Sequence, residues 1–185
     1  MTTKREVFYG VISQELAPYF FEKMEEKKIC SFFGHREIAN DETLYERTRE
    51  AIFDALEAGC KTFYFGGYGE FDELCYSIVS QIKRNCPNAG IERVYCVSQE
   101  RYLWKKVRYF NREDYDEVIY LEPSFTGWYK SIYFRNCAMI NESAVVIFYA
   151  EERAESGAYK AYKYARKKKD KQIINLWQKE EKTEE

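Results

Sequence analysis

The sequence is poor in the residues from which many kinds of functional site are built. Its 185 residues include one histidine, His35, and three prolines, and its six cysteines form no C-x-x-C pair. Zinc sites need closely spaced cysteine and histidine ligands, so no metal site is predicted. Several cysteines fall within apolar patterns that are typical of reduced thiols in a protein core. We therefore expect no metal, no cofactor and a cytoplasmic location.

Long apolar runs and a strong net charge are also missing. No apolar stretch approaches the roughly 20 residues of a membrane-spanning helix, and the first residues lack the apolar core of a signal peptide. The 29 Lys and Arg residues are balanced by 31 Asp and Glu residues, which gives a net charge of −2. Binding of nucleic acid by bulk electrostatics requires an excess of positive charge, so neither nucleic acid nor a membrane is an expected partner. A protein partner and a homo-oligomer stay open.

What is present is a regular alternation of short apolar runs with amphipathic stretches. Helices are predicted at Asp41–Ala58 and around Tyr129–Asn141, each between two apolar runs. Such β-α alternation favours a parallel sheet that is covered by helices on both faces. We predict a Rossmann-like three-layer α/β domain with a mostly parallel sheet of about six strands. The predicted strands are Ile29–Phe33, Thr62–Phe65, Ile91–Val97, Glu117–Leu121, Ala144–Ala150 and Gln172–Trp177.

The length of the chain fits one domain. We assign this domain to residues 28–178. Residues 1–27 are interpreted as a helical extension that is interrupted near Pro18, and residues 179–185 as a charged, disordered tail.

Three closely spaced glycines interrupt the apolar run that begins at Phe63. Gly66, Gly67 and Gly69 separate a predicted strand from an amphipathic helix. Glycine lets a ligand approach the backbone closely, and the free N–H groups at a helix start attract phosphate. Glycines after a strand often serve the turn alone, and this spacing matches neither common nucleotide-binding motif. Both interpretations stay open on this feature.

Two further turns are expected at the same edge of the sheet, where α/β folds bind their ligands. The first strand ends in Gly34-His35-Arg36, and the fifth is followed by Ser156-Gly157 at a helix start. The guanidinium group of Arg36 suits phosphate or carboxylate, and His35 can hydrogen-bond a ribose or a phosphate. A structural role for His35 in its loop and a salt bridge for Arg36 are the alternatives.

Four motifs, in this order, resemble the SLOG superfamily and in particular its YpsA-like branch. That branch has a strand ending in T-G-H-R, a GG-x-x-G-F-D-like turn, an R-N-x-x-M-[IV] helix and an S-G-T-like turn. The matching stretches here are Ser31–Arg36, Gly66–Asp72, Tyr133–Asn141 and Ser156–Ala158. The resemblance spans roughly residues 28 to 177 and implies a Rossmann-like domain with a nucleotide-type pocket.

The resemblance also implies which residues line that pocket. Backbone N–H groups and guanidinium groups would hold a phosphate, Tyr68 or Phe71 would cover a base or ribose, and Asp72 would accept ribose hydroxyls. Packing roles for the two aromatic residues and a helix-start role for Asp72 are the alternatives. We expect Arg135, as a polar residue at the rim, to matter more for ligand binding than for folding. The predicted ligand-binding residues are Gly34, His35, Arg36, Gly66, Gly67, Tyr68, Gly69, Phe71, Asp72, Arg135, Asn136, Ser156 and Gly157.

The sequence departs from the catalytic members of the superfamily. Lys160 and Ala161 stand where the LOG enzymes, which cleave the base from nucleoside monophosphates, carry the acidic pair of a P-G-G-x-G-T-x-E-E motif. The carboxylate that would stabilise a cationic transition state is missing, so catalysis is not the favoured interpretation. We predict a nucleotide-binding sensor or regulatory module of a bacterial cytosolic pathway. A nucleoside-phosphate glycosidase is one alternative.

A partner-binding or single-stranded-DNA-binding scaffold is the other alternative. A helix is predicted over Ser156–Lys169, and it carries six cations: Lys160, Lys163, Arg166, Lys167, Lys168 and Lys169. Such a run usually forms a solvated face. It could also contact DNA, as the DNA-processing protein A of the same superfamily does.

Overall fold

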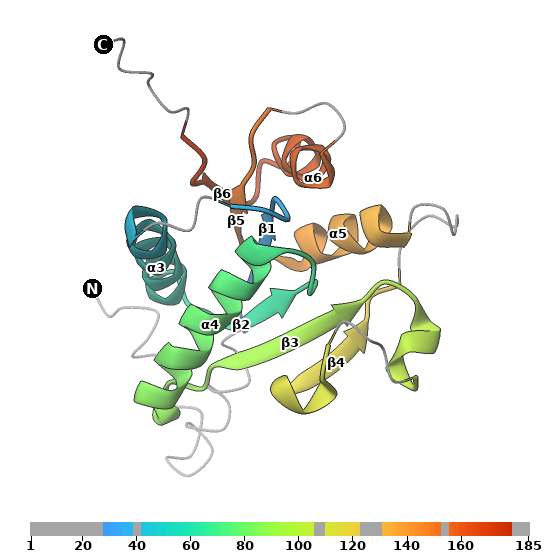
Figure 1. Ribbon diagram of the computed structural model, residues 1–185, viewed down its shortest axis with the longest axis horizontal. Coiled ribbons are helices and arrows are strands. Elements are labelled where there is room, and N and C mark those ends of the chain that lie inside the picture. Colours follow the sequence, from blue (N-terminus) through green and yellow to red (C-terminus); the bar gives the residue numbers. More distant parts are fainter. Residues whose placement is uncertain (1–27, 39–41, 106–109, 123–130, 153–155, 179–185) are drawn as a thin grey trace, which may run out of the picture.

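The computed structural model describes residues 28–38, 42–105, 110–122, 131–152 and 156–178. The predicted extension at residues 1–27 and the predicted tail at residues 179–185 lie outside these ranges. Within them, six parallel strands form one sheet in the order β4-β3-β2-β1-β5-β6 (Figure 1). The strands are β1 Lys28–Gly34, β2 Cys60–Phe65, β3 Glu92–Val97, β4 Glu117–Tyr120, β5 Val145–Tyr149 and β6 Gln172–Asn175.

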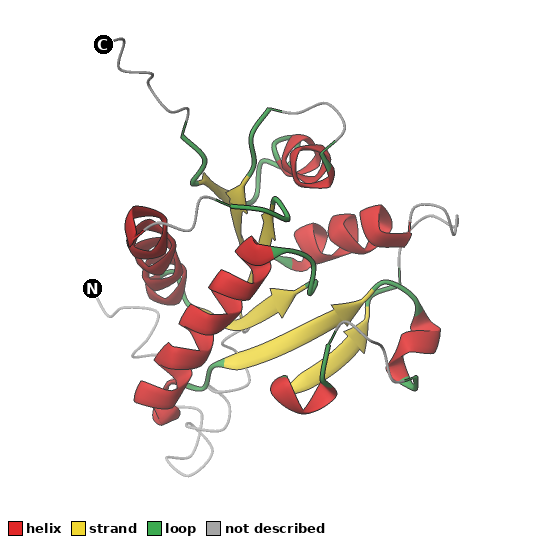
Figure 2. Cartoon of the chain, in the orientation of Figure 1, coloured by secondary structure: helices red, strands yellow, loops and turns green. Residues whose placement is uncertain are grey.

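Four α-helices in the described ranges flank this sheet (Figure 2). They are α3 Glu42–Glu57, α4 Glu70–Asn85, α5 Ser131–Glu142 and α6 Gly157–Ala165. Helices α3 and α4 pack on one face, against a core that contains Phe32, Phe63 and Phe65. Helices α5 and α6 pack on the other face, against a core that contains Phe33 and Phe148.

The central strand β1 shows how the sequence separates these two cores. Successive side chains of a strand point to opposite faces of the sheet. Phe32 therefore joins the α3/α4 core, where its ring stacks on Phe63 with centroids 6.0 Å apart. Phe33 joins the α5/α6 core and stacks on Phe148 at 5.4 Å. Residues 30 to 33 are all buried, as a strand covered on both faces requires.

The order of the strands places a reversal between β1 and β5. The chain runs outward from β1 through β2 and β3 to β4, and then crosses to β5 on the other side of β1. Helix α3, which follows β1, and helix α6, which follows β5, therefore lie on opposite faces. Beyond the carboxyl ends of these two strands the helices diverge, and such a point is where open α/β sheets bind their ligands.

The predicted fold is confirmed, and each predicted strand ends within two residues of an observed one. The helix predicted over Ser156–Lys169 is wrong in its length. Helix α6 ends at Ala165, because the amides of Lys167 and Lys168 donate to carbonyls only three residues back, at 3.2 and 2.8 Å. Bonds of this kind tighten and end an α-helix. The cations at positions 166 to 169 therefore lie beyond the helix rather than along it.

Candidate functional site

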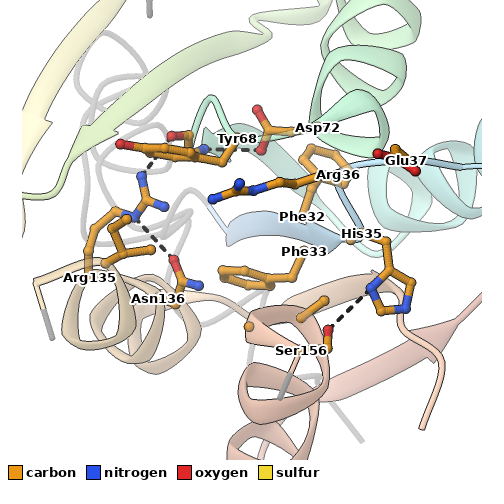
Figure 3. Close-up of a pocket in the computed structure, with 15 residues that line it drawn as sticks. Phe32, Phe33, His35, Arg36, Glu37, Tyr68, Asp72, Arg135, Asn136 and Ser156 are labelled. Atoms are coloured by element: carbon orange, nitrogen blue, oxygen red, sulfur yellow. Dashed lines mark hydrogen bonds between the residues drawn. The ribbon is translucent and has the colours of Figure 1, made fainter. Parts of the chain in front are cut away.

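A cavity of about 560 Å³ opens at the carboxyl edge of the sheet. The end of β1, the turn before α4, the start of α5 and the start of α6 form its walls (Figure 3). The structure brings together ten of the predicted ligand-binding residues here: Gly34, His35, Arg36, Gly66, Tyr68, Asp72, Arg135, Asn136, Ser156 and Gly157. Phe32, Phe33, Glu37, Ile132 and Ala158 complete the lining.

The glycine turn is held by the carboxylate of Asp72. The N–H of Gly66 donates to Oδ1 at 3.1 Å, and the N–H of Gly67 donates to Oδ2 at 2.9 Å. Asp72 lies in the first turn of α4, so the turn folds back onto the helix that it introduces. The two amides that this turn would offer to a phosphate are occupied by a carboxylate of the protein itself.

Asp72 is a buried aspartate whose carboxyl has a raised pKa. Its side chain is buried, with 6% of its surface exposed. Burial raises the pKa of its carboxyl to about 6, although the amides of Gly66 and Gly67 and the charge of Arg135 favour the carboxylate. A buried acid with a pKa near neutrality, on the wall of a cavity, is a pattern found at functional sites.

Arg135 is buried, which corrects the sequence-based expectation that it is a polar residue at the rim. Only 4% of its surface is exposed. Nη1 donates to the carbonyls of Gly66 at 2.7 Å and Cys96 at 3.1 Å, and Nε donates to Oδ1 of Asn136 at 3.1 Å. Arg135 thus ties α5 to the ends of β2 and β3. Nη2 has no hydrogen-bond partner among the described residues, and Arg135 lines the cavity.

Arg36 is the second arginine of the cavity, and its side chain is exposed. In Figure 3 the guanidinium groups of Arg36 and Arg135 point toward each other near the ring of Tyr68. The guanidinium carbon of Arg135 lies 5.5 Å from the centroid of that ring, within the range of a cation–π contact. Guanidinium groups donate strong, charge-assisted hydrogen bonds to carboxylate and phosphate groups.

The loop that carries Arg36 is fixed by Glu70. The Ile38 N–H donates to Oε2 of Glu70 at 3.0 Å, and the Glu70 N–H donates to the carbonyl of Arg36 at 2.9 Å. Gly69 allows this contact: it has a φ of 96°, and a Cβ there would lie 2.6 Å from Cα of Arg36. Glu70 is not among the residues that line the cavity.

His35 orients Ser156 rather than activating it. The N–H of Glu151 donates to Nε2 of His35 at 2.8 Å, so the ring proton is on Nδ1. Nδ1 lies 3.2 Å from Oγ of Ser156 and donates to it, and the Tyr159 N–H donates to the same oxygen at 3.3 Å. Because Oγ already accepts two hydrogen bonds, its own proton is available to an acceptor in the cavity.

The start of α6 adds backbone donors to the cavity. The N–H groups of Gly157 and Ala158 have no hydrogen-bond partner among the described residues, and both residues line the cavity. Ser156 is the N-cap of this helix. The N-terminus of α6 therefore presents backbone donors to the cavity, as helix starts that bind anions do.

Three of the predicted residues support the cavity without lining it. Phe71 is fully buried and stacks on Tyr149 at 5.7 Å. Gly67 and Gly69 shape the turn, as described above. Sequence reasoning missed Phe33, although it directly precedes Gly34 at the strand end; its ring forms part of the wall.

Neither a metal cluster nor a membrane span is found in the part of the chain that the structure describes. No group of three or more His, Cys, Asp or Glu side chains there could hold a metal ion. No helix among the described residues is both long and apolar enough to cross a bilayer.

Comparison with known proteins adds information on the fold. No protein-family model matches the sequence, and a comparison with curated proteins gives no match either. Among solved structures, DNA processing protein A (DprA) from Streptococcus pneumoniae is similar, with 15% identity and a TM-score of 0.55 over 80% of this chain and 50% of that one. The chain therefore spans about half the length of that protein.

A second DprA structure, from Helicobacter pylori, was described for its single-stranded DNA binding mode. It has 15% identity and a TM-score of 0.55 over 83% of this chain and 67% of that one. At such identity the two likenesses establish a Rossmann-like fold related to that of DprA.

Proposed function

We propose that the cavity binds the phosphate group of a nucleotide and that the protein acts as a sensor or regulatory module. The observation that carries this proposal is the convergence of the guanidinium groups of Arg36 and Arg135, with Nη2 of Arg135 unpartnered among the described residues. A guanidinium group makes charge-assisted, bidentate contacts to phosphate. An anion between the two groups would neutralise their repulsion.

The other walls suit the remainder of a nucleotide. The rings of Phe33 and Tyr68 offer flat surfaces for a base or ribose. The amides of Gly157 and Ala158 and the hydroxyl of Ser156 add donors for phosphate oxygens. A volume of about 560 Å³ lies within the usual range for small-molecule sites. The resemblance to the YpsA-like branch supports the same class of ligand.

Binding without catalysis is the function that we favour. Glu37 and Asp72 are the acids that line the cavity, and both oxygens of Asp72 already accept backbone hydrogen bonds. A glycosidase would have to use Glu37 or Asp72 in place of the acidic pair that Lys160 and Ala161 replace. Chromatographic release of free base from nucleoside monophosphates, lost in Asp72→Asn, would contradict our proposal.

Single-stranded DNA is the second candidate ligand, and the structural neighbours favour it. The H. pylori DprA binds single-stranded DNA. Here the indole of Trp104 follows β3 at the same edge of the sheet and is 83% exposed, and Tyr133 at the start of α5 is 37% exposed. Exposed aromatic rings near basic groups are typical of surfaces on which bases stack.

One pair of measurements tests the main proposal. Thermal unfolding is followed with AMP, ADP or ADP-ribose at millimolar concentration; binding at a hundredfold excess over Kd stabilises the native state by about 2.7 kcal/mol. Arg36→Ala should weaken binding by at least tenfold, because a charged hydrogen bond contributes about 1.5–3 kcal/mol. Arg49→Ala, an exposed arginine on α3, is the matched control. No stabilisation by any nucleotide would contradict a nucleotide site.

A second pair of measurements distinguishes single-stranded DNA from a free nucleotide as the ligand. Fluorescence anisotropy with a labelled thymidine oligonucleotide is measured at several salt concentrations, since contacts to phosphates make the affinity salt-dependent. Trp104→Ala should weaken oligonucleotide binding if bases stack there, and should leave nucleotide binding unchanged. Oligonucleotide binding that needs Trp104, together with no response to free nucleotides, would replace the main proposal with the second.

A further inference from the structure

The two helix starts at the cavity differ in whether their backbone donors are occupied. In the glycine turn that leads into α4, the amides of Gly66 and Gly67 donate to Asp72. At α6 the amides of Gly157 and Ala158 have no partner among the described residues. A glycine turn after a strand is expected to bind phosphate through such amides. In this protein the carboxylate of Asp72 takes that place.

We propose that Asp72 is a specificity-determining residue of the cavity: it closes the glycine turn to anions, so that a phosphate is held by Arg36, Arg135 and the start of α6 instead. This inference rests on the proposed phosphate site and adds where in it the anion binds. The second observation beside the helix starts is Arg135, which is more than nine-tenths buried and lines the cavity with Nη2 unpartnered among the described residues.

The position of Asp72 selects among phosphate ligands. A carboxylate at one side of the cavity repels a second phosphate group placed near it and accepts hydrogen bonds from hydroxyl or amino groups. The cavity therefore favours one phosphate group next to a donor-bearing moiety, such as a ribose. Diphosphate chains are disfavoured, because their second charged group would approach the closed turn.

The charge of Asp72 depends on groups from every element that packs around it. Arg135 of α5 favours the carboxylate, whereas Glu73 of α4 disfavours it. Tyr95, Tyr115, Cys75 and Cys96 also face it, and burial raises the pKa of each above its usual value. These four groups are neutral near pH 6, so Asp72 titrates there while its neighbours keep their charge. Across the cavity, His35 lines the opposite wall.

Calorimetric titration with inorganic phosphate and with pyrophosphate at pH 8 tests the inference. In the native protein, pyrophosphate should bind no more tightly than phosphate. Asp72→Asn removes the charge and should strengthen pyrophosphate binding by about tenfold, the effect of one charged contact. Glu73→Gln removes an equal charge from an exposed position one residue away and should change affinity by less than twofold.

Sulfate binding across pH gives a second readout that needs no change at Asp72. Sulfate keeps its charge between pH 5 and pH 8, so tighter binding at the lower pH reports on the protein. The tightening should persist in His35→Gln and should be lost in Asp72→Asn. If sulfate still binds more tightly at the lower pH in Asp72→Asn, another group is responsible for the pH dependence and the inference is overturned.

The outcomes separate this inference from the proposed function. If the native protein binds phosphate and Asp72→Asn binds pyrophosphate no more tightly, the inference fails and the phosphate site stands. If only Asp72→Asn binds either anion, the closed turn is supported and the proposed function of the native protein fails. If neither protein binds phosphate, pyrophosphate or sulfate, both fail.

Discussion

An aspartate and an arginine lie near each of the two edges of the sheet, and the hydrogen-bond partners of these side chains differ between the edges. At the amino edge, Asp116 accepts hydrogen bonds from Nε of Arg93 at 3.2 Å and from Nζ of Lys83 at 2.9 Å. At the carboxyl edge, Asp72 accepts from backbone amides, and Arg135 donates to backbone carbonyls and to Asn136. No ion pair joins Asp72 and Arg135 in the described part of the chain.

This difference separates a structural charge cluster from a candidate binding site. Burial alone would raise the pKa of both aspartates. The hydrogen bonds from Arg93 and Lys83 overcome it and lower the pKa of Asp116 to about 2, whereas the pKa of Asp72 rises to about 6. The ion pair between Asp116 and Arg93 joins the segment before β4 to β3. Asp72 and Arg135 form no such pair in the described part of the chain, and charged groups of this kind beside a cavity are typical of sites that bind a ligand.

The largest expected effect comes from truncating the two arginines. Arg135→Ala leaves the carbonyls of Gly66 and Cys96 without their donor in a buried place and should cost about 3 kcal/mol of unfolding free energy. Arg93→Ala, at the more exposed edge, should cost about 1 kcal/mol. Urea denaturation of both variants measures this. Equal losses would mean that Arg135 is not the structural tie between α5 and the strand ends.

The second effect is a change in the stability of the fold between pH 4 and pH 6. The folded protein holds the Asp72 proton more tightly than the unfolded chain, whose aspartates titrate near 4. The contribution of Asp72 to stability is therefore largest below pH 4 and is lost as the pH rises to about 6, by up to about 3 kcal/mol. Urea midpoints at several pH values should show this decline in the native protein relative to Asp72→Asn. A constant difference between the two would contradict the raised pKa.

The third effect has the opposite sign and arises at the other edge. The pKa of Asp116 is depressed, so its contribution to stability is present above about pH 4 and is lost as the pH falls toward 2. The pair is partly exposed, and the loss should be about 1 kcal/mol. Acid unfolding of Asp116→Asn should lack this component. If the native protein and the variant decline in parallel below pH 4, the cluster does not stabilise the fold.

The smallest effect is expected at Lys83. Its ammonium contacts Asp116 at 2.9 Å and donates to the carbonyl of Ile91 at 2.7 Å. Lys83→Met should cost about 0.5 kcal/mol, and less at 1 M salt, because the pair is screened. Thermal melts at two salt concentrations suffice. A loss that does not depend on salt would assign the effect to the hydrogen bond rather than to the charge.

The sequence predicted the parts of the site that follow from strand ends. Gly34 and Gly66 directly follow apolar runs and Ser156 follows one after a short loop, and parallel strands bring their carboxyl ends to one edge. Their gathering around one cavity could therefore be anticipated. The length of α6 was overestimated because the run of Arg and Lys at positions 166 to 169 contains no residue that breaks a helix, whereas the hydrogen bonds change after Ala165.

The role of Arg135 could not be predicted from its neighbours in sequence. Its partners Gly66 and Cys96 are 69 and 39 residues away. A lone arginine in an amphipathic helix has the same local pattern whether it is exposed or buried. Likewise, the interaction of Asp72 with two glycine amides depends on the path of the turn, which the glycines permit without dictating.

The sequence by itself determined the succession of strands and helices along the chain and the burial of the sheet on both faces, because apolar periodicity is a local property of the chain. The tertiary structure alone decided which charges are paired. Asp116 lies across the sheet edge from Arg93, whereas Asp72 folds back onto the glycine turn and Arg135 reaches the strand carbonyls. Pairing depends on distances of about 3 Å between groups that are 5 to 69 residues apart in sequence, and the fold of the turn and the packing of the complete domain set those distances.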